Sequence, residues 1–155
     1  LLNFTLVAGG LFLVAGMLHQ RLGSTDILAL GGAARSMPLL ASLFLFLGLA
    51  SLGLPGTSGF PAELLILVSA LRTHTGAGLA ALFAMVVGAA YFLNLYRRAF
   101  LGPVERAPVA GAHDLRPREL ALLLVFAALI LGIGLYPEPV LELIRPAAEA
   151  WTTRF

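Results

Sequence analysis

The sequence predicts an all-helical (all-α) integral membrane protein with four transmembrane helices, one of them broken, and a C-terminal interfacial helix. Of its 155 residues, 59% are hydrophobic and 12% are charged, and the mean hydropathy is +0.95. Soluble domains carry roughly 25% charged residues, so this chain is too apolar to be an ordinary soluble protein. Long apolar segments, and a run of helix breakers inside one of them, supply the rest of the prediction.

Four long apolar segments predict the spans. Residues 1–18, 76–96 and 119–136 are each close to the roughly 20 helical residues that a bilayer core requires. Residues 38–71 are too long, because one unbroken helix of that length would measure on the order of 50 Å. The run PGTSGFP at residues 55–61 interrupts this segment. We therefore predict a helix broken at Pro55-Gly56.

The arginine residues set the expected orientation. Residues 19–37 and the linker 97–118 together carry seven of the ten arginines, and the opposite side carries three. The positive-inside rule puts these two connections in the cytoplasm or matrix and the C-terminal tail on the opposite face. The charges at residues 114–119, near the start of the last span, are expected to form a solvated cluster.

The tail, residues 138–155, is expected to form a helix in the membrane interface. Val140, Ile144 and Trp151 recur at helical spacing, with charged residues on the other faces. Trp151 is expected at the level of the lipid headgroups, where its amphipathic ring is favoured. Packing of this helix on a neighbouring subunit would explain the pattern equally well.

The strongest candidate for function is Glu63, a single carboxylate just after the break. A carboxylate near the bilayer centre costs about 2.5–3.5 kcal/mol on insertion scales, so one that is retained is a functional candidate. The break frees backbone groups, which in lipid must be buried in protein or line a hydrated cavity. We therefore expect Glu63 to transfer protons, with Pro55, Gly56 and Gly59 shaping the break. The alternative is that Glu63 only stabilises the start of the following helix.

Other polar residues in the spans are weaker candidates for a polar or water-filled path. Asn3 and Thr5 lie in the first span, and Tyr91 and Asn94 lie one helical turn apart in the third. Side chains of these types can hold water in a membrane protein. Hydrogen bonding between helices is the alternative for all of them.

The composition excludes several kinds of site. The net charge of +2 comes from scattered arginines without any lysine, which argues against a nucleic-acid-binding face. The absence of cysteine excludes thiolate metal sites, and His19, His74 and His113 fall in predicted connections too far apart in sequence to suggest a metal cluster. No quinone, flavin or iron–sulfur signature is present. The glycines at positions 9, 10, 132 and 134 are expected to let helices approach closely.

The breaker run belongs to a longer motif, ASLGLPGTSGFPAELLIL at residues 50–67. Further motifs accompany it: LGGA at 30–33 with MP at 37–38, LYRRAFLG at 95–102, DLRPREL at 114–120 and GLYPEP at 134–139. In this order, over nearly the whole chain, they resemble subunit M of respiratory complex I (NADH-quinone oxidoreductase), an antiporter-like membrane subunit. Residues 50–67 resemble its broken twelfth helix. Related antiporter-like subunits typically have lysine where this chain has Glu63, so the glutamate favours subunit M.

The resemblance implies that the chain corresponds to the last four of fourteen spanning helices, with its C-terminus on the periplasmic or intermembrane side. It implies a role in coupling NADH oxidation by quinone to proton pumping, with Glu63 as the carboxylate of the distal proton channel. No cofactor is expected in this chain, and quinone, FMN and Fe-S clusters are expected on partner subunits. The expected partners are L-like and N-like antiporter subunits, the remaining N-terminal helices of the same subunit and the lipid bilayer. A bacterial inner membrane is expected, with a mitochondrial or other energy-transducing membrane as the alternative.

Phe4 departs from the pattern of the family, which usually has at this position a histidine thought to relay protons to the carboxylate. Phenylalanine cannot relay a proton, so water, Asn3 or Thr5 would have to bridge the gap. Three other functions remain open: a cation/proton antiporter subunit, a subunit of a complex-I-related membrane hydrogenase, and a structural membrane scaffold without its own transport.

Overall fold

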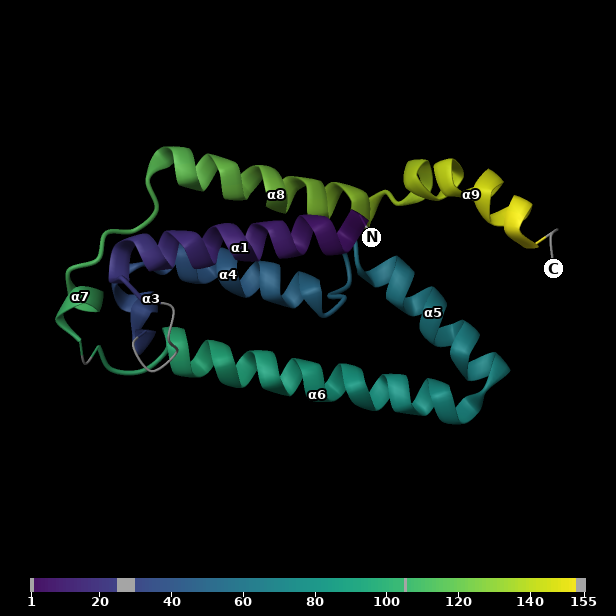
Figure 1. The fold of residues 1–155 in the computed structure, drawn as a ribbon, viewed down its shortest axis with the longest axis horizontal. Helices are drawn as coiled ribbons and strands as arrows, with labels where there is room; N and C mark the ends of the chain where they lie inside the picture. The colour runs from purple at the N-terminus through teal and green to yellow at the C-terminus, as the bar shows by residue number, and fades with distance from the viewer. Residues whose placement is uncertain (1, 25–29, 105, 153–155) are drawn as a thin grey trace.

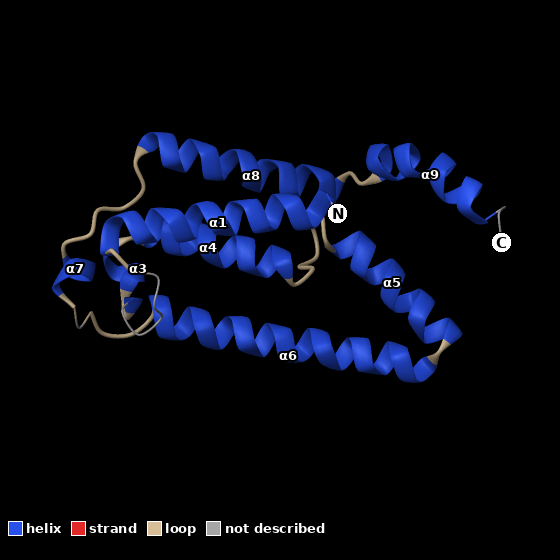
Figure 2. Cartoon of the chain, viewed as in Figure 1, coloured by secondary structure: helices blue, strands red, loops and turns tan. Residues whose placement is uncertain are grey.

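The structure is a computed structural model that describes residues 2–24, 30–104 and 106–152, with side chains up to residue 146. Within these ranges the chain consists of helices and loops (Figure 2). The helices are α1 (Leu2–Leu22), α3 (Ala33–Ser36), α4 (Pro38–Ser51), α5 (Phe60–Thr73), α6 (Thr75–Phe100), α7 (Ala107–Ala110), α8 (Pro117–Leu135) and α9 (Glu138–Thr152).

Helices α1, α4 and α8 form a packed bundle, and they lie side by side in Figure 1. Their shared core is apolar and includes Val14, Leu47, Leu123 and Ile130, each at most 1% exposed. Helix α5 leaves this bundle, turns at His74 and pairs with α6, which runs back towards α3. The bundle therefore holds the first half of the broken helix, and the α5–α6 hairpin carries the second half.

The long apolar segment is broken where the sequence predicts. Helix α4 ends at Ser51 and α5 begins at Phe60. Gly53 and Gly56 in the connection have φ of +66° and +93°, left-handed values that favour glycine. Pro61 lies in the first turn of α5, where the missing N–H of proline has no helical partner to lose. The predicted fold class, an all-helical membrane protein with one broken helix, is confirmed.

The helix lengths agree with a membrane protein. Helices α1, α6 and α8 are each long and apolar enough to cross a bilayer, and α4 is a shorter apolar helix. One expected boundary is wrong, because α1 continues to Leu22 and so contains His19 and Arg21, which were expected in a connection. Hydropathy marks the apolar part of a span, whereas the hydrogen-bonded helix continues into polar residues.

Glycines bring α1 and α8 close to their neighbours. A Cβ atom on Gly10 would lie 2.9 Å from the Leu47 side chain of α4, so only glycine fits without movement there. On α8, a Cβ atom on Gly134 would lie 2.6 Å from the Cα atom of Thr57 in the break. Gly132 has open space around it, so the expected close approach does not hold at this position.

Aromatic rings hold the C-terminal end of α6 to α4. The ring centroid of Phe44 lies 5.8 Å from that of Phe92 and 4.8 Å from that of Phe100. Tyr96 stacks on Phe100 at 5.2 Å. Such pairs add about 0.5–1.5 kcal/mol each beyond the burial of their area. Helix α6 is thus fixed to the bundle at one end, while its other end pairs with α5.

The predicted tail helix is present as α9, with Pro146 inside it. Leu141, Leu143 and Ile144 on this helix are exposed. Exposed apolar side chains fit a helix that lies in a membrane interface, and this location stays a prediction. The expected position of Trp151 at the headgroups concerns a side chain outside the described ones.

The contact of α8 with the break makes a testable prediction. We expect Gly134→Ala to destabilise the protein by about 1–3 kcal/mol, because the added methyl group overlaps backbone atoms that cannot rotate away. The thermal midpoint of the detergent-solubilised protein measures this effect. Gly132→Ala is the matched control on the same helix, and it should be neutral or slightly stabilising because alanine favours a helix. Equal midpoints for the two variants would contradict the packing described here.

Candidate functional site

Glu63 lies in the first turn of α5, next to the break. Its backbone N–H donates to the carbonyl of Gly59 at 3.0 Å, so the residue already belongs to the helical ladder. Its half-buried side chain reaches back across the break to Gly53, where a Cβ atom would lie 2.8 Å from the Glu63 carboxyl carbon. The position of the carboxylate therefore depends on a glycine at residue 53.

A cleft of about 360 Å³ surrounds the Glu63 side chain. It lies between the end of α4, the start of α5 and the middle of α6, and its lining comprises Ser51, Leu52, Glu63, Ile66, Leu67, Ala81, Ala84, Met85 and Gly88. Glu63 and Ser51 carry the polar side chains of this lining, and the rest is apolar. The arrangement isolates one carboxylate in a largely apolar cleft, which is the setting expected for a functional carboxylate.

A second cleft, of about 120 Å³, lies on the other side of the end of α4. It is lined by Asn3, Phe4, Val7, Ala8, Leu11 and Ser51. The hydroxyl of Ser58 in the break donates to Oδ1 of Asn3 at 2.7 Å, which ties the first turn of α1 to the break. Asn3 and Phe4 therefore lie at the break, and Ser51 borders both clefts.

The hydroxyl groups of the break are buried and bonded. Thr57 is 1% exposed and Ser58 is 8% exposed, and the Thr57 hydroxyl donates to the Leu54 carbonyl at 2.7 Å. The Thr57 backbone N–H donates to the same carbonyl at 3.0 Å. Such bonds satisfy backbone oxygens that lack a helical partner, as a nonpolar environment requires. In the sequence these residues stand out only as part of a breaker run, although serine and threonine beside a break are a usable signal.

The structure gathers only some of the residues expected to form a polar path. Asn3 lies at the break and in the second cleft, near the connection that contains Gly56 and Gly59. Thr5 is exposed and lies outside the lining of both clefts. Tyr91 and Asn94 are exposed on α6 and also lie outside these linings. Helical geometry explains the separation, because positions 91 and 94 lie about one to two turns beyond Gly88, the last residue of α6 in the Glu63 cleft.

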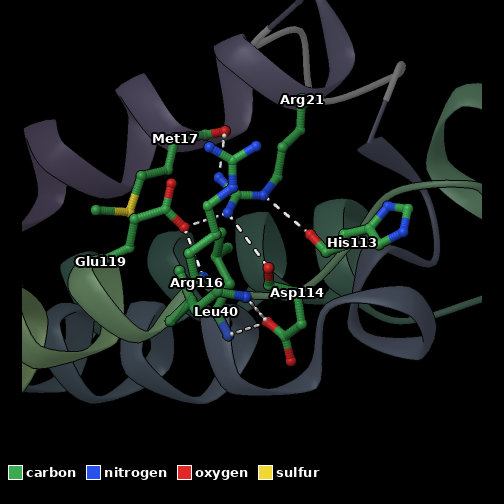
Figure 3. Close-up of polar contacts among 8 residues, drawn as sticks. Met17, Arg21, Leu40, His113, Asp114, Arg116 and Glu119 are labelled. Carbon is green, nitrogen blue, oxygen red and sulfur yellow. Dashed lines mark hydrogen bonds and ion pairs between the residues drawn. The ribbon is translucent and has the colours of Figure 1, made fainter.

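A second polar cluster fixes the end of the bundle far from the break, and Figure 3 shows it. Arg21 at the end of α1 forms an ion pair with Glu119 in the first turn of α8. Its guanidinium also donates to the carbonyls of Met17 at 3.1 Å, His113 at 2.9 Å and Asp114 at 3.3 Å. One arginine therefore joins α1, the loop before α8 and α8 itself.

Asp114 caps the start of α4 from this loop. Its carboxylate accepts from the backbone N–H groups of Leu39 at 2.8 Å and Leu40 at 3.1 Å, and Figure 3 shows the contact with Leu40. These donors have no partner within a helix, so a carboxylate there acts as an N-cap supplied by another segment. The expectation of a solvated charge cluster at residues 114–119 is therefore wrong for Asp114 and Glu119. Local sequence patterns could not predict these contacts, because the partners are 74 to 98 residues apart.

The cleft beside this cluster is larger, about 780 Å³, but it is not the candidate site. In its lining, Arg21 and Glu119 already form an ion pair, and the carboxylate of Asp114 already accepts from the start of α4. Across the described ranges, His, Asp and Glu side chains do not gather in groups of three that would hold a metal ion. We therefore assign the candidate site to the break and Glu63.

Comparisons with known proteins identify relatives of the chain. A family model described as "NADH:quinone oxidoreductase/Mrp antiporter, TM" matches residues 1–88. The chain is 36% identical over 147 residues to "NADH-quinone oxidoreductase subunit M" of Rhodobacter capsulatus, which covers 95% of this chain and 29% of the relative. It is 37% identical to the protein of the same name in Mycobacterium tuberculosis, over 96% of this chain and 27% of the relative. The chain thus spans less than a third of the length of these relatives.

Among solved structures, the chain is similar to part of "Respiratory complex I from Thermus thermophilus with bound NADH". The TM-score is 0.86 and the sequence identity is 35%, over 95% of this chain and 31% of the other. The arrangement of helices around the break is therefore similar to that in a solved membrane complex.

The Arg21 cluster yields a second testable prediction. We expect Arg21→Gln to lower the free energy of unfolding by about 1–3 kcal/mol, because Glu119 and the loop carbonyls then lose a partly buried donor. Arg118→Gln makes the same chemical change at an exposed site nearby and should cost less than about 0.5 kcal/mol. Denaturant unfolding in detergent micelles measures both variants. A cost for Arg118→Gln as large as that for Arg21→Gln would show that the cluster is not what stabilises this end.

Proposed function

The chain belongs to the NADH:quinone oxidoreductase/Mrp antiporter transmembrane family, and from this premise we propose that it is part of a proton-translocating subunit of respiratory complex I. The relatives named NADH-quinone oxidoreductase subunit M and the similarity to a complex I structure support this proposal. In the proposed complex, the chain supplies helices around one proton channel and is a subunit of the NADH:quinone oxidoreductase enzyme. The redox chemistry belongs to other subunits.

The observation that carries the proposal is the position of Glu63 at a helix break, in a cleft between α4, α5 and α6. Ionisable residues inside membrane proteins are rare, and they mark substrate, ion and proton pathways. Broken helices supply backbone groups beside transported charges in many transporters. The chain combines both features at one point, and the Glu63 carboxylate lies against Gly53, close to the end of α4.

In the proposed cycle, the Glu63 carboxylate takes a proton from water in its cleft and later releases one. The side chain thus alternates between an anionic and a neutral form. Because water stabilises the anion, a change in the hydration of the cleft shifts the balance between the two forms. The redox reaction elsewhere in the complex would drive that change.

The exposed surface of α5 and α6 bears on the partners and the location of the chain. The exposed apolar surfaces of α5 and α6, such as Leu65, Ile66, Phe83 and Val86, fit burial against further membrane helices or lipid. We expect these partners to be the remaining N-terminal helices of the same subunit and the L-like and N-like antiporter subunits. Quinone, FMN and Fe-S clusters are expected on partner subunits. The bacterial origin of the relatives favours a bacterial inner membrane.

A cation/proton antiporter subunit is the second candidate, because the family description names both kinds of protein. Replacement of sodium in a transport assay separates the two functions, since only an antiporter would depend on that cation. A membrane scaffold without transport, or a subunit of a complex-I-related membrane hydrogenase, would also use this fold. Subunit composition of the purified complex separates the hydrogenase from complex I.

The central prediction concerns the charge of Glu63. We expect Glu63→Gln to lower the number of protons translocated per NADH oxidised while the complex still assembles, because glutamine keeps the size of the side chain but cannot exchange a proton. Proton translocation is measured with the complex reconstituted in liposomes. Glu142→Gln makes the same change on α9, at an exposed position outside the linings of both clefts, and should leave the stoichiometry unchanged.

Two results would contradict this prediction. An unchanged proton stoichiometry in Glu63→Gln would remove Glu63 from the pathway. Loss of assembly in Glu63→Gln, with normal assembly in Glu142→Gln, would indicate a structural role and favour the scaffold function.

Gly53 provides a further prediction about the position of the carboxylate. We expect Gly53→Ala to lower the rate of proton translocation, because the added methyl group would displace the Glu63 carboxylate. Gly23→Ala is the matched control, since Gly23 has nearly the same backbone angle, a φ of +68° against +66°, but open space around it. Both variants carry the strain of alanine at positive φ, about 1–2 kcal/mol. Equal translocation rates in the two variants would show that the contact with Gly53 does not matter for transport.

A further inference from the structure

We propose that Ser51 joins the Glu63 cleft to the Asn3 cleft and anchors a chain of water molecules along which protons reach or leave Glu63. The inference rests on the proposed proton transport and deepens it by naming the residue that links the two clefts. Ser51 is the last residue of α4, directly before the break.

The first observation is the shared lining. Ser51 borders the cleft of about 360 Å³ that contains Glu63 and also the cleft of about 120 Å³ that contains Asn3. The remaining lining residues of the two clefts, apart from Glu63 and Asn3, have apolar side chains. Ser51 is therefore the polar side chain that the two linings have in common.

The second observation is the state of the Ser51 hydroxyl. It donates to the carbonyl of Gly48 at 2.6 Å, one turn earlier in α4. A serine hydroxyl has one hydrogen to donate and two lone pairs that accept. Because the hydrogen is used within the helix, the oxygen presents acceptor positions, which suit water molecules that donate to it. Ser51 thus orients water without giving up its own proton.

The Asn3 cleft supplies the other end of the chain of waters. Oδ1 of Asn3 accepts from the Ser58 hydroxyl. The Nδ2 atom of Asn3 lies beside Gly59, since a Cβ atom added to Gly59 would be 2.8 Å from Nδ2. The amide NH₂ group retains hydrogens that can be donated to water in the cleft. Polar groups therefore border the path at Glu63, at Ser51 and at Asn3.

The clefts have room for this water. A water molecule occupies about 30 Å³ in the liquid, so both clefts have the volume for several molecules. Bound water also needs polar partners, which Glu63, Ser51 and Asn3 supply in these linings. Protons move along such a chain by transfer from one water to the next, each water gaining one proton and releasing another. The carboxylate of Glu63 gains or loses the proton at the end, and Ser51 is chemically unchanged. Ser51 is accordingly a positioning residue.

The test compares variants of the assembled complex in liposomes, with the rate of proton translocation as the readout. We expect Ser51→Ala to slow translocation about two- to tenfold, the factor expected from the loss of one hydrogen bond to water. Ser51→Thr keeps the hydroxyl and should restore most of the rate. Ser42→Ala is the matched control, because Ser42 lies on the same helix and donates to the Pro38 carbonyl at 2.8 Å but borders neither cleft.

Three further measurements make the result decisive. In a Glu63→Gln background, Ser51→Ala should cause no additional loss, since both residues act on one path. If Ser51→Ala fails to assemble, Ser51→Thr is compared with Ser51→Val, which has nearly the same shape without the hydroxyl, and only the valine variant should be slow. The solvent deuterium isotope effect on translocation should increase in Ser51→Ala, because transfer through the disrupted chain becomes slower.

The outcomes separate this inference from the proposed function. A normal rate in Ser51→Ala together with a large loss in Glu63→Gln would overturn the role of Ser51 and leave Glu63 as the proton carrier. Normal proton stoichiometry in Glu63→Gln would overturn both. Equal losses in Ser51→Ala and Ser42→Ala would also overturn the inference, because they would reflect weakening of α4 and not the linked clefts.

Discussion

The structure depends on how the backbone groups of the break between α4 and α5 find partners without bulk water. In lipid an unpaired backbone group costs several kcal/mol, so a membrane helix can be interrupted only where protein satisfies the freed groups. Here the connection bonds to itself and to the end of α4: the carbonyl of Leu54 accepts from both the backbone and the side chain of Thr57, and that of Leu49 accepts from Leu54. Asn3 of α1 bonds to Ser58, and Gly134 of α8 lies against Thr57, so the neighbouring helices close over the break.

The two ends of α4 have different environments, and the candidate site follows from that difference. At its start, α4 is held by the carboxylate of Asp114, which is itself fixed through the contacts of Arg21 with the same loop. At its end, α4 meets the break, the serine at position 51 and the carboxylate of Glu63. Helix α4 is therefore fixed at its start, and the Glu63 carboxylate on α5 lies against its other end. The α5–α6 hairpin contacts the bundle through aromatic rings towards the end of α6.

The sequence was sufficient for the fold class, which rests on strong local signals. Similar local signals single out Glu63, whose role in proton transfer stays a prediction. A run of proline and glycine inside an overlong apolar segment favours a break in the helix, and Glu63 is the one acidic residue in that segment. Long-range contacts were not predictable: the pairing of Arg21 with Glu119 joins residues 98 positions apart, and hydropathy carries no information about it. The polar path stays a prediction: Asn3 lies at the break, whereas Tyr91 and Asn94 are exposed on α6. The role proposed for Ser51 rests on its place in the linings of both clefts, which the sequence does not reveal.

The most direct test of the account is whether the Glu63 carboxylate changes its protonation during turnover. Infrared difference spectra of the assembled complex, recorded before and after reduction by NADH, report changes in carboxyl groups. The account predicts a carboxyl band that is present in the wild-type complex, disappears in Glu63→Gln and persists in Glu142→Gln. A difference spectrum whose carboxyl bands are identical in the wild type and in Glu63→Gln would contradict it, because Glu63 would then keep one protonation state throughout the cycle.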